Sequence, residues 1–165
     1  MQTISPAGSS RDTGVLLWRV TNAWQRRLRA TLKPAGLTQA QFYLLLALSR
    51  LEGRGPVTQA RLAVASGIDP TMVSTVIREL GQRGLLTRRQ GQDARTRMIA
   101  LTAPGREALA TALPAVASAD SDFFAALKAD RDAFAQALGI LIGIRPRVTA
   151  RSRAVPPDEE PTTPR

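Results

Sequence analysis

Residues 57–84, VTQARLAVASGIDPTMVSTVIRELGQRG, decide the fold because they describe two short helices joined by a tight turn. Thr58 is placed to cap the first helix, and Gly67 is placed to end it. Asp69 is placed to cap the second helix, and Pro70 occupies its first position. Proline fits there because the N–H that it lacks would have no partner within the helix. Two short helices around a glycine-bearing turn are the pattern of a helix-turn-helix.

The second of these helices has one apolar face and one polar face. Apolar side chains recur at helical spacing: Val73, Val76, Ile77 and Leu80. The opposite face carries hydrogen-bonding groups and a single basic charge: Thr71, Ser74, Thr75, Arg78 and Gln82. Taken alone, such a polar face is typical of a solvated helix.

The periodicity changes after residue 84. Residues 85–89, LLTRR, and residues 97–101, RMIAL, indicate two strands around the polar tip QGQDART. Helix, helix and ribbon, in this order, are typical of a winged helix-turn-helix. The predicted fold class is therefore mainly α with a small β-ribbon wing.

Further helices are expected on both sides of this segment. An amphipathic pattern from about residue 14 to 33 indicates the first. Thr38 and Gln41, three positions apart, form a capping box for the next. After Thr102 we expect a long helix that is kinked or broken at Pro114.

Composition excludes several classes of function. The 165-residue chain has no cysteine and no histidine, so it lacks thiolate metal ligands, disulfides and the commonest general base. The formal net charge of +10 predicts attraction to polyanions. Residues 98–144 differ, because they carry three basic and five acidic side chains, and we expect their surface to lie away from a bound polyanion. No apolar run approaches the roughly 20 residues that span a bilayer. We expect a cytoplasmic protein that is not an enzyme and holds no cofactor or metal.

Between residues 37 and 105 the chain resembles the MarR (multiple antibiotic resistance regulator) family of bacterial transcription factors. The matching positions are Leu37-Thr38-x-x-Gln41-Phe42, Leu62-Ala63, Ile68, Thr71-x-Val73-Ser74-x-Val76, Leu80-x-x-x-Gly84-Leu85-Leu86-x-Arg88, Asp93-x-Arg95 and Leu101-Thr102-x-x-Gly105. The resemblance implies a winged helix whose N- and C-terminal helices intertwine into a dimer. It predicts five segments: a disordered arm (1–13), an N-terminal dimerisation helix (14–36), a DNA-binding lobe (37–102), C-terminal dimerisation helices (103–144) and a disordered tail (145–165).

In this context the polar helix face is expected to enter the major groove of DNA rather than only to meet solvent. Arg78 would contact a phosphate or a guanine edge, and the short neighbouring side chains would let the helix approach the bases. The predicted contacts are Pro70, Thr71, Ser74, Thr75 and Arg78. Backbone amides near Thr58 and Gln59, at the start of the preceding helix, are expected to meet phosphates.

The arginines of the ribbon have two interpretations, a soluble hairpin edge or a contact to the neighbouring minor groove. The predicted wing contacts are Arg88, Arg89, Asp93, Arg95 and Arg97, with Arg95 the first choice. Asp93 either pairs with a nearby arginine and orients it, or makes an Asx-type turn after Gly91.

The terminal helices carry more apolar residues than a small winged-helix core can bury, so a homodimer is expected. Its predicted contacts are Leu17, Val20, Trp24, Phe124, Phe134, Leu138 and Leu141. In the last helix Phe134, Leu138, Leu141 and Ile142 are expected to face inward. The resemblance also implies an effector pocket lined by Trp18, Trp24, Phe42 and Tyr43, for which core packing is the plainer interpretation.

These patterns predict a homodimeric repressor that binds an inverted-repeat operator and is released by a small apolar or anionic effector. The alternative is a basic nucleic-acid-binding protein, of the nucleoid or RNA-binding type, without operator preference.

Overall fold

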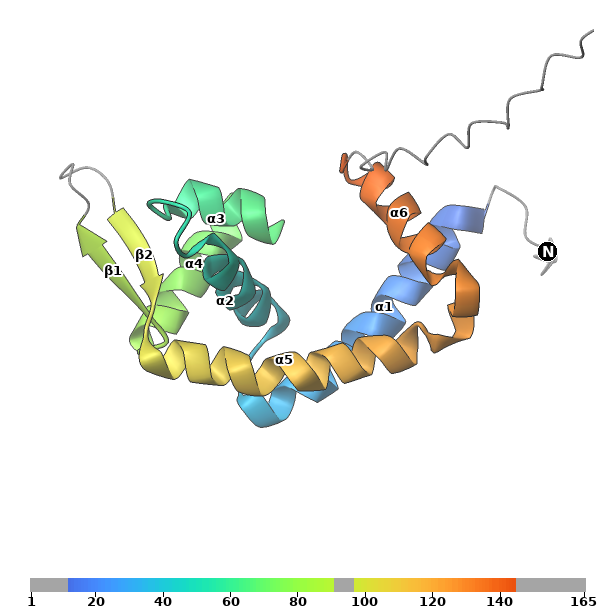
Figure 1. Cartoon of the computed structure of the whole chain (residues 1–165), viewed down its shortest axis with the longest axis horizontal. Helices are drawn as coiled ribbons and strands as arrows, with labels where there is room; N and C mark the ends of the chain where they lie inside the picture. The colour runs from blue at the N-terminus through green and yellow to red at the C-terminus, as the bar shows by residue number, and fades with distance from the viewer. Residues whose placement is uncertain (1–11, 91–96, 145–165) are drawn as a thin grey trace, which may run out of the picture. The chain divides into compact units, whose positions relative to one another are not determined.

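The computed structural model describes residues 12–90 and 97–144 of the chain. Figure 1 shows helices throughout, with a single strand pair between α4 and α5. The elements are α1 (Thr13–Leu32), η2 (Lys33–Ala35), α2 (Gln39–Leu51), α3 (Gln59–Ser66), α4 (Pro70–Gln82), β1 (Leu86–Gln90), β2 (Arg97–Leu101), α5 (Ala103–Phe123), η3 (Ala125–Asp130) and α6 (Arg131–Leu141). They form two units, divided after Phe124, and each is described by itself. None of the helices described is long and apolar enough to span a membrane.

The helix starts are set by the side chains that the sequence places there. Thr38 Oγ1 accepts the N–H of Gln41, and Gln41 Oε1 accepts the N–H of Thr38, so the capping box of α2 is complete. Thr58 Oγ1 caps α3 by accepting the N–H of Arg61. Asp69 Oδ1 caps α4 by accepting the N–H of Thr71 at 2.8 Å. The predicted starts of these three helices are confirmed.

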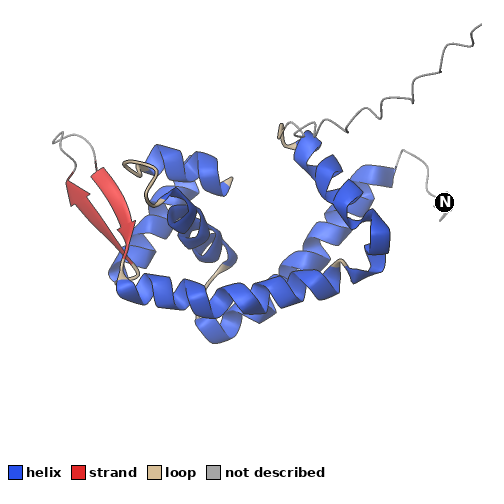
Figure 2. Cartoon of the chain, in the orientation of Figure 1, coloured by secondary structure: helices blue, strands red, loops and turns tan. Residues whose placement is uncertain are grey.

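Helix α4 ends at a left-handed glycine and leads directly into the strand pair. Gly84 has φ of +70°, and the next N–H, of Leu85, returns to the carbonyl of Leu80. Strands β1 and β2 are antiparallel, with Leu86 opposite Leu101 (Figure 2). The N–H of Ile99 on β2 donates outward to the carbonyl of Val57, which ties the segment before α3 to the ribbon.

The core of the first unit gathers side chains from α1, α2, α3, α4, the ribbon and α5. The four residues of the predicted apolar stripe of α4 are all buried, and the largest fully buried side chains around them are Phe42, Leu28, Leu32, Leu44, Leu45, Leu48 and Leu62. With the core on one side of α4, the opposite face of that helix remains in solvent.

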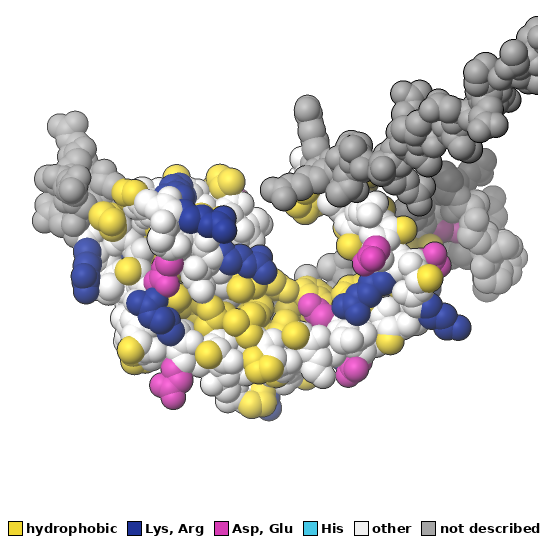
Figure 3. All heavy atoms as spheres, in the orientation of Figure 1, with side chains coloured by type: hydrophobic (Ala, Val, Ile, Leu, Met, Phe, Trp, Pro, Cys, Tyr) yellow, Lys and Arg dark blue, Asp and Glu magenta, His cyan; other side chains and the backbone are white. Residues whose placement is uncertain are grey.

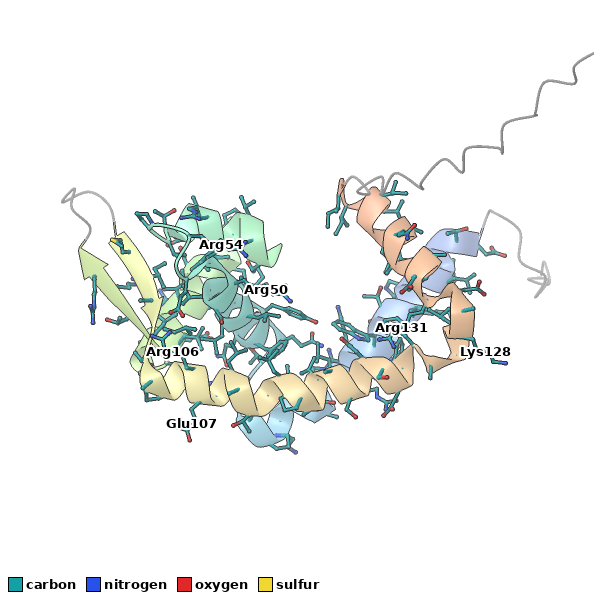
Figure 4. All side chains as sticks on the ribbon, viewed as in Figure 1. Arg50, Arg54, Arg106, Glu107, Lys128 and Arg131 are labelled. Carbon is teal, nitrogen blue, oxygen red and sulfur yellow. The ribbon has the colours of Figure 1, made fainter. Side chains whose placement is uncertain are left out.

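The strand pair joins α5 at a very close backbone approach. A Cβ added at Gly105 would lie 1.9 Å from the carbonyl oxygen of Leu85, so only glycine fits. Thr102 caps α5 through the N–H of Gly105, and its hydroxyl donates to the carbonyl of Gly84. Arg106, labelled in the first turn of α5 in Figure 4, contacts both carboxylate oxygens of Glu52 through Nη1, at 2.5 and 2.6 Å.

The outer helices depart from expectation at two points. Of the two alternatives expected at Pro114, a break is not seen: α5 runs from Ala103 to Phe123 through the proline, with Ala112 and Val116 on either side of it buried. In the second unit Leu141 and Ile142 are not inward-facing, since about three quarters of each side chain is exposed. Phe134 and Leu138 are half-buried.

Candidate nucleic-acid interface

The outer face of α4 presents the polar residues that the sequence placed there. Pro70, Thr71, Ser74, Thr75 and Arg78 are all exposed, while the stripe behind them is buried. They therefore share one solvent-facing side of a helix that is held rigidly by the core. Short hydroxyl side chains followed by one arginine suit a surface that approaches base edges closely.

Helix α3 is bonded to this face at its first residue. Gln59 Nε2 donates a hydrogen bond to Ser74 Oγ, so the start of α3 and the middle of α4 lie side by side. The start of α3, with the N-cap Thr58 next to Gln59, therefore borders the polar face of α4.

Asp69, which directly precedes this face in the sequence, is the N-cap of α4. The hydrogen bond from the Thr71 amide lowers the pKa of Asp69 below its ordinary value. Asp69 is therefore ionised at neutral pH and directs its charge onto the first turn of α4, where it complements the helix dipole.

Strand β1 brings a second arginine close to α4. Arg78 and Arg88 both line a hollow of about 340 Å³ between α4 and β1, together with Ile77, Gly81, Leu86 and Thr87. Arg89, the next residue of β1, is exposed as well. Arg97 begins β2, and its backbone pairs with Gln90. Asp93 and Arg95 lie outside the described residues.

Basic side chains extend over the rest of this lobe. Figure 3 shows Lys and Arg side chains distributed over the face in view. Arg50 near the end of α2 and Arg54 in the loop after it are labelled on the ribbon in Figure 4. The lobe that carries α4 therefore presents positively charged side chains, which attract a polyanion.

A buried glutamine links α2 to α4, which the sequence did not predict. Gln41 is 6% exposed, and its Nε2 donates to Glu79 at 3.1 Å. Its Oε1 accepts from Arg83 Nη1 at 3.0 Å, and the same nitrogen of Arg83 donates to the carbonyl of Gly36. The capping box identified Gln41, but nothing local indicated partners some 40 positions away.

The aromatic residues proposed for an effector pocket occupy different environments. Phe42 is 1% exposed and belongs to the core, which corrects its assignment to a pocket wall. Trp18 is 69% exposed, so it faces solvent in the single chain. Trp24 and Tyr43 are partly buried with ring centroids 6.3 Å apart, and Trp24 Nε1 donates to Asp120 Oδ1 on α5 at 2.8 Å. Burial, assisted by the charge of Asp120, raises the pKa of Tyr43 to about 12.

Of the seven residues predicted for dimerisation, three are exposed in the single chain and four, Trp24, Phe124, Phe134 and Leu138, are partly buried. Leu17 and Val20 on α1 are 48% and 41% exposed, next to the exposed Val15, Leu16 and Trp18. Phe124, at the end of α5, is half-buried and stacks edge-on against Phe123. The second unit exposes Ile140, Leu141, Ile142 and Ile144. Each unit thus keeps an apolar surface that its own residues do not cover.

Within residues 12–90 and 97–144 no three acidic side chains gather closely enough to hold a metal ion.

Comparisons with known proteins agree on one family. The model of the MarR family matches residues 35–96. The chain is 38% identical over 122 residues to the helix-turn-helix transcriptional regulator YdcH of Bacillus subtilis, covering 73% of this chain and 83% of the relative. It is 33% identical over 117 residues to the transcriptional repressor Mb2911 of Mycobacterium bovis, covering 70% and 82%.

A solved structure shares the fold over most of the chain. The transcriptional repressor CouR, bound to a 23-mer DNA duplex, superposes with a TM-score of 0.73 at 28% identity and covers 86% of this chain and 99% of its own. CouR from Rhodococcus jostii RHA1 has also been solved with p-coumaroyl-CoA, and that structure superposes with a TM-score of 0.72 at 27% identity, covering 86% and 98%.

Proposed function

Because the chain belongs to the MarR family of DNA-binding, winged helix-turn-helix transcriptional regulators, we propose that it is a repressor that binds an inverted-repeat operator as a homodimer. Helix α4 is the recognition helix, and the ribbon of β1 and β2 is the wing. Relatives named as repressors, Mb2911 and CouR, support this direction of regulation.

The observation that carries the proposal is the exposed face of α4. Thr71, Ser74, Thr75 and Arg78 point away from a helix whose other side is locked into the core. Arg78 and Arg88 line one hollow, so the recognition helix and the wing present positive charge together. This arrangement suits one helix in a major groove and one ribbon beside it.

The exposed apolar side chains of α1 and α6 support the homodimer. Leu17 and Val20 on α1, and Leu141 on α6, are each more than 40% exposed, and exposed apolar side chains gathered on a helix often mark a protein interface. A symmetric dimer places two recognition helices about 34 Å apart, one turn of DNA, and an inverted repeat matches that symmetry.

A small apolar or anionic effector would release the repressor by binding a dimer whose helix spacing no longer fits the operator. Such control needs only different affinities for the two spacings. Trp24 and Tyr43 are the aromatic pair that remains available, because both are only partly buried and both lie close to Asp120. A solved neighbour, BpsR of Bordetella bronchiseptica, is described as regulated in its DNA binding by a small anion of this kind, 6-hydroxynicotinic acid.

Selection of bound sequences from a random DNA pool tests the proposal. Recovery of a palindrome, bound roughly 10³-fold or more tightly than random duplex at physiological salt, is the expected result. Equal affinity for all duplexes would instead identify a nucleic-acid-binding protein without operator preference. Sedimentation of the free protein checks the dimer independently of DNA.

A further inference from the structure

A second basic surface lies on the side of the recognition helix that faces away from the wing's arginines. It is a groove of about 640 Å³ between the end of α1, the start of α2 and the start of α4. We call it the α1–α4 groove and define it by six of its lining residues, which are Arg29, Lys33, Leu37, Thr38, Ala40 and Met72. None of them was predicted to contact a partner.

The groove combines two cations with an apolar floor. Arg29 in the last turn of α1 and Lys33, which follows that helix as the first residue of η2, are four positions apart, and both are exposed. Neither forms an ion pair with any acidic side chain of residues 12–90 and 97–144, whereas Arg27 is paired with Asp122 at 3.0 Å. Met72, from α4, is one of the apolar residues that line the groove, and 54% of it is exposed.

Met72 makes the groove continuous with the proposed DNA-binding face. It follows Thr71 directly in the first turn of the recognition helix. When a helix enters the major groove, the sugar–phosphate strands pass along its two sides. One of those sides holds the hollow with Arg78 and Arg88, and the other holds the α1–α4 groove.

We infer that the α1–α4 groove binds the sugar–phosphate backbone of one DNA strand, an inference that rests on the proposed operator binding. Arg29 and Lys33 contact a phosphate, and an adjoining deoxyribose lies on Leu37, Ala40 and Met72. The groove is more open than enclosed, which suits a polymer lying across it, whereas a small-molecule site encloses most of its ligand.

The dependence of DNA affinity on salt and on sequence distinguishes side chains that bind phosphates from side chains that read bases. Removing a phosphate-binding cation weakens binding to all sequences alike, and it lowers the slope of log affinity against log salt by about 0.9. Removing a side chain that reads a base changes sequence preference instead.

The test compares Arg29→Ala, Lys33→Ala and the double variant with Arg19→Ala, which removes the same charge from the same helix ten positions earlier. Each protein is titrated with a duplex recovered by selection and with a random-sequence duplex of equal length, over a series of salt concentrations. Circular dichroism and sedimentation confirm that each variant is folded and dimeric.

For each groove variant we expect affinity to fall on the order of three- to tenfold on both duplexes, with the salt slope falling by about 0.9 per residue removed. Arg19→Ala should leave the slope unchanged. A slope equal to that of the unaltered protein in both groove variants would overturn the inference. So would a decrease confined to the selected duplex.

A small anion is the competing occupant. If the groove variants keep their salt slope on DNA but no longer bind benzoate, measured by calorimetry on the free protein, the groove is an effector site and the inference is wrong. If the unaltered protein fails to prefer any selected duplex, the operator proposal fails, while the salt slope on random duplex still decides whether the groove contacts DNA.

Discussion

Gln59 Nε2, at the first residue of α3, donates a hydrogen bond to Ser74 Oγ on the exposed face of α4. One lone pair of this hydroxyl is therefore held by a residue of another helix before any DNA arrives, and its proton is left to donate to a partner. A recognition surface that is ordered in advance loses less conformational entropy on binding.

Gln59→Ala should weaken binding to the selected operator about fivefold, since a typical hydrogen bond contributes about 1 kcal/mol. The measurement is a double-mutant cycle with Ser74→Ala in a gel-shift titration. If Gln59 acts through Ser74, the double variant binds as well as Ser74→Ala alone. Additive decreases in affinity would show instead that Gln59 contacts DNA independently.

Tyr43 should titrate near pH 12 in the folded protein and near pH 10 in urea, because burial and Asp120 raise its pKa. It is the single tyrosine of the chain, so phenolate absorbance reports it alone. The folded state keeps this proton between pH 10 and 12 while the unfolded chain has lost it. The contribution of Tyr43 to stability therefore falls as the pH rises through that window.

Asp120→Asn is the matched control for this titration. The amide oxygen still accepts the Trp24 N–H, so the packing is preserved while the charge is removed. The pKa of Tyr43 should fall but stay above 10, because burial is the larger cause. A pKa unchanged by Asp120→Asn would contradict the role given to that carboxylate.

Gln41→Ala should destabilise the protein by about 1 to 3 kcal/mol, because it removes the partner of Thr38, Glu79 and Arg83 at a buried position. Urea unfolding measures the change in stability. A cycle with Arg83→Ala should give a coupling of about 0.5 to 1.5 kcal/mol. Zero coupling would mean that Gln41 only caps α2.

Gly81→Ala and Gly105→Ala should change stability in opposite directions. At Gly81, inside α4, an added Cβ meets only Leu86 Cδ1, at 3.8 Å, so alanine should stabilise by about 1 kcal/mol through helix propensity. At Gly105 the Cβ would collide with the carbonyl of Leu85, and a destabilisation of about 3 kcal/mol is expected. A midpoint in urea at or below that of the unaltered protein for Gly81→Ala would contradict the first assignment, and an unchanged or higher midpoint for Gly105→Ala would contradict the second.

The parts of the fold that sequence could predict are those decided within a few residues. Thr38, Thr58 and Asp69 cap helices by bonding to amides two or three positions away, and Gly84 ends α4 through its own backbone angle. The alternation of the two strands is equally local. A break at Pro114, one of the two alternatives that the local rule for proline allows, is not seen where the residues on either side of it are buried.

The parts of the candidate site that sequence missed depend on distant partners. The polar face of α4 is visible as a helical repeat, but the bond from Gln59 to Ser74 requires the angle between two helices. The α1–α4 groove joins Met72 to cations about 40 positions earlier. Leu141 and Ile142 have the pattern of inward-facing residues, yet a periodic pattern does not say whether the buried side meets the same chain or another one.

The approach of Gly105 to Leu85 gives the wing a mechanical property. Strand β1 begins one residue after Leu85 and α5 begins two residues before Gly105, so ribbon and helix meet where no atom can be added. Because the backbones of Leu85 and Gly105 are packed without free space, a displacement of one is passed on to the other. A tilt of α5 would therefore move Leu85, and with it both the start of β1 and the end of α4, because the N–H of Leu85 is bonded to the carbonyl of Leu80.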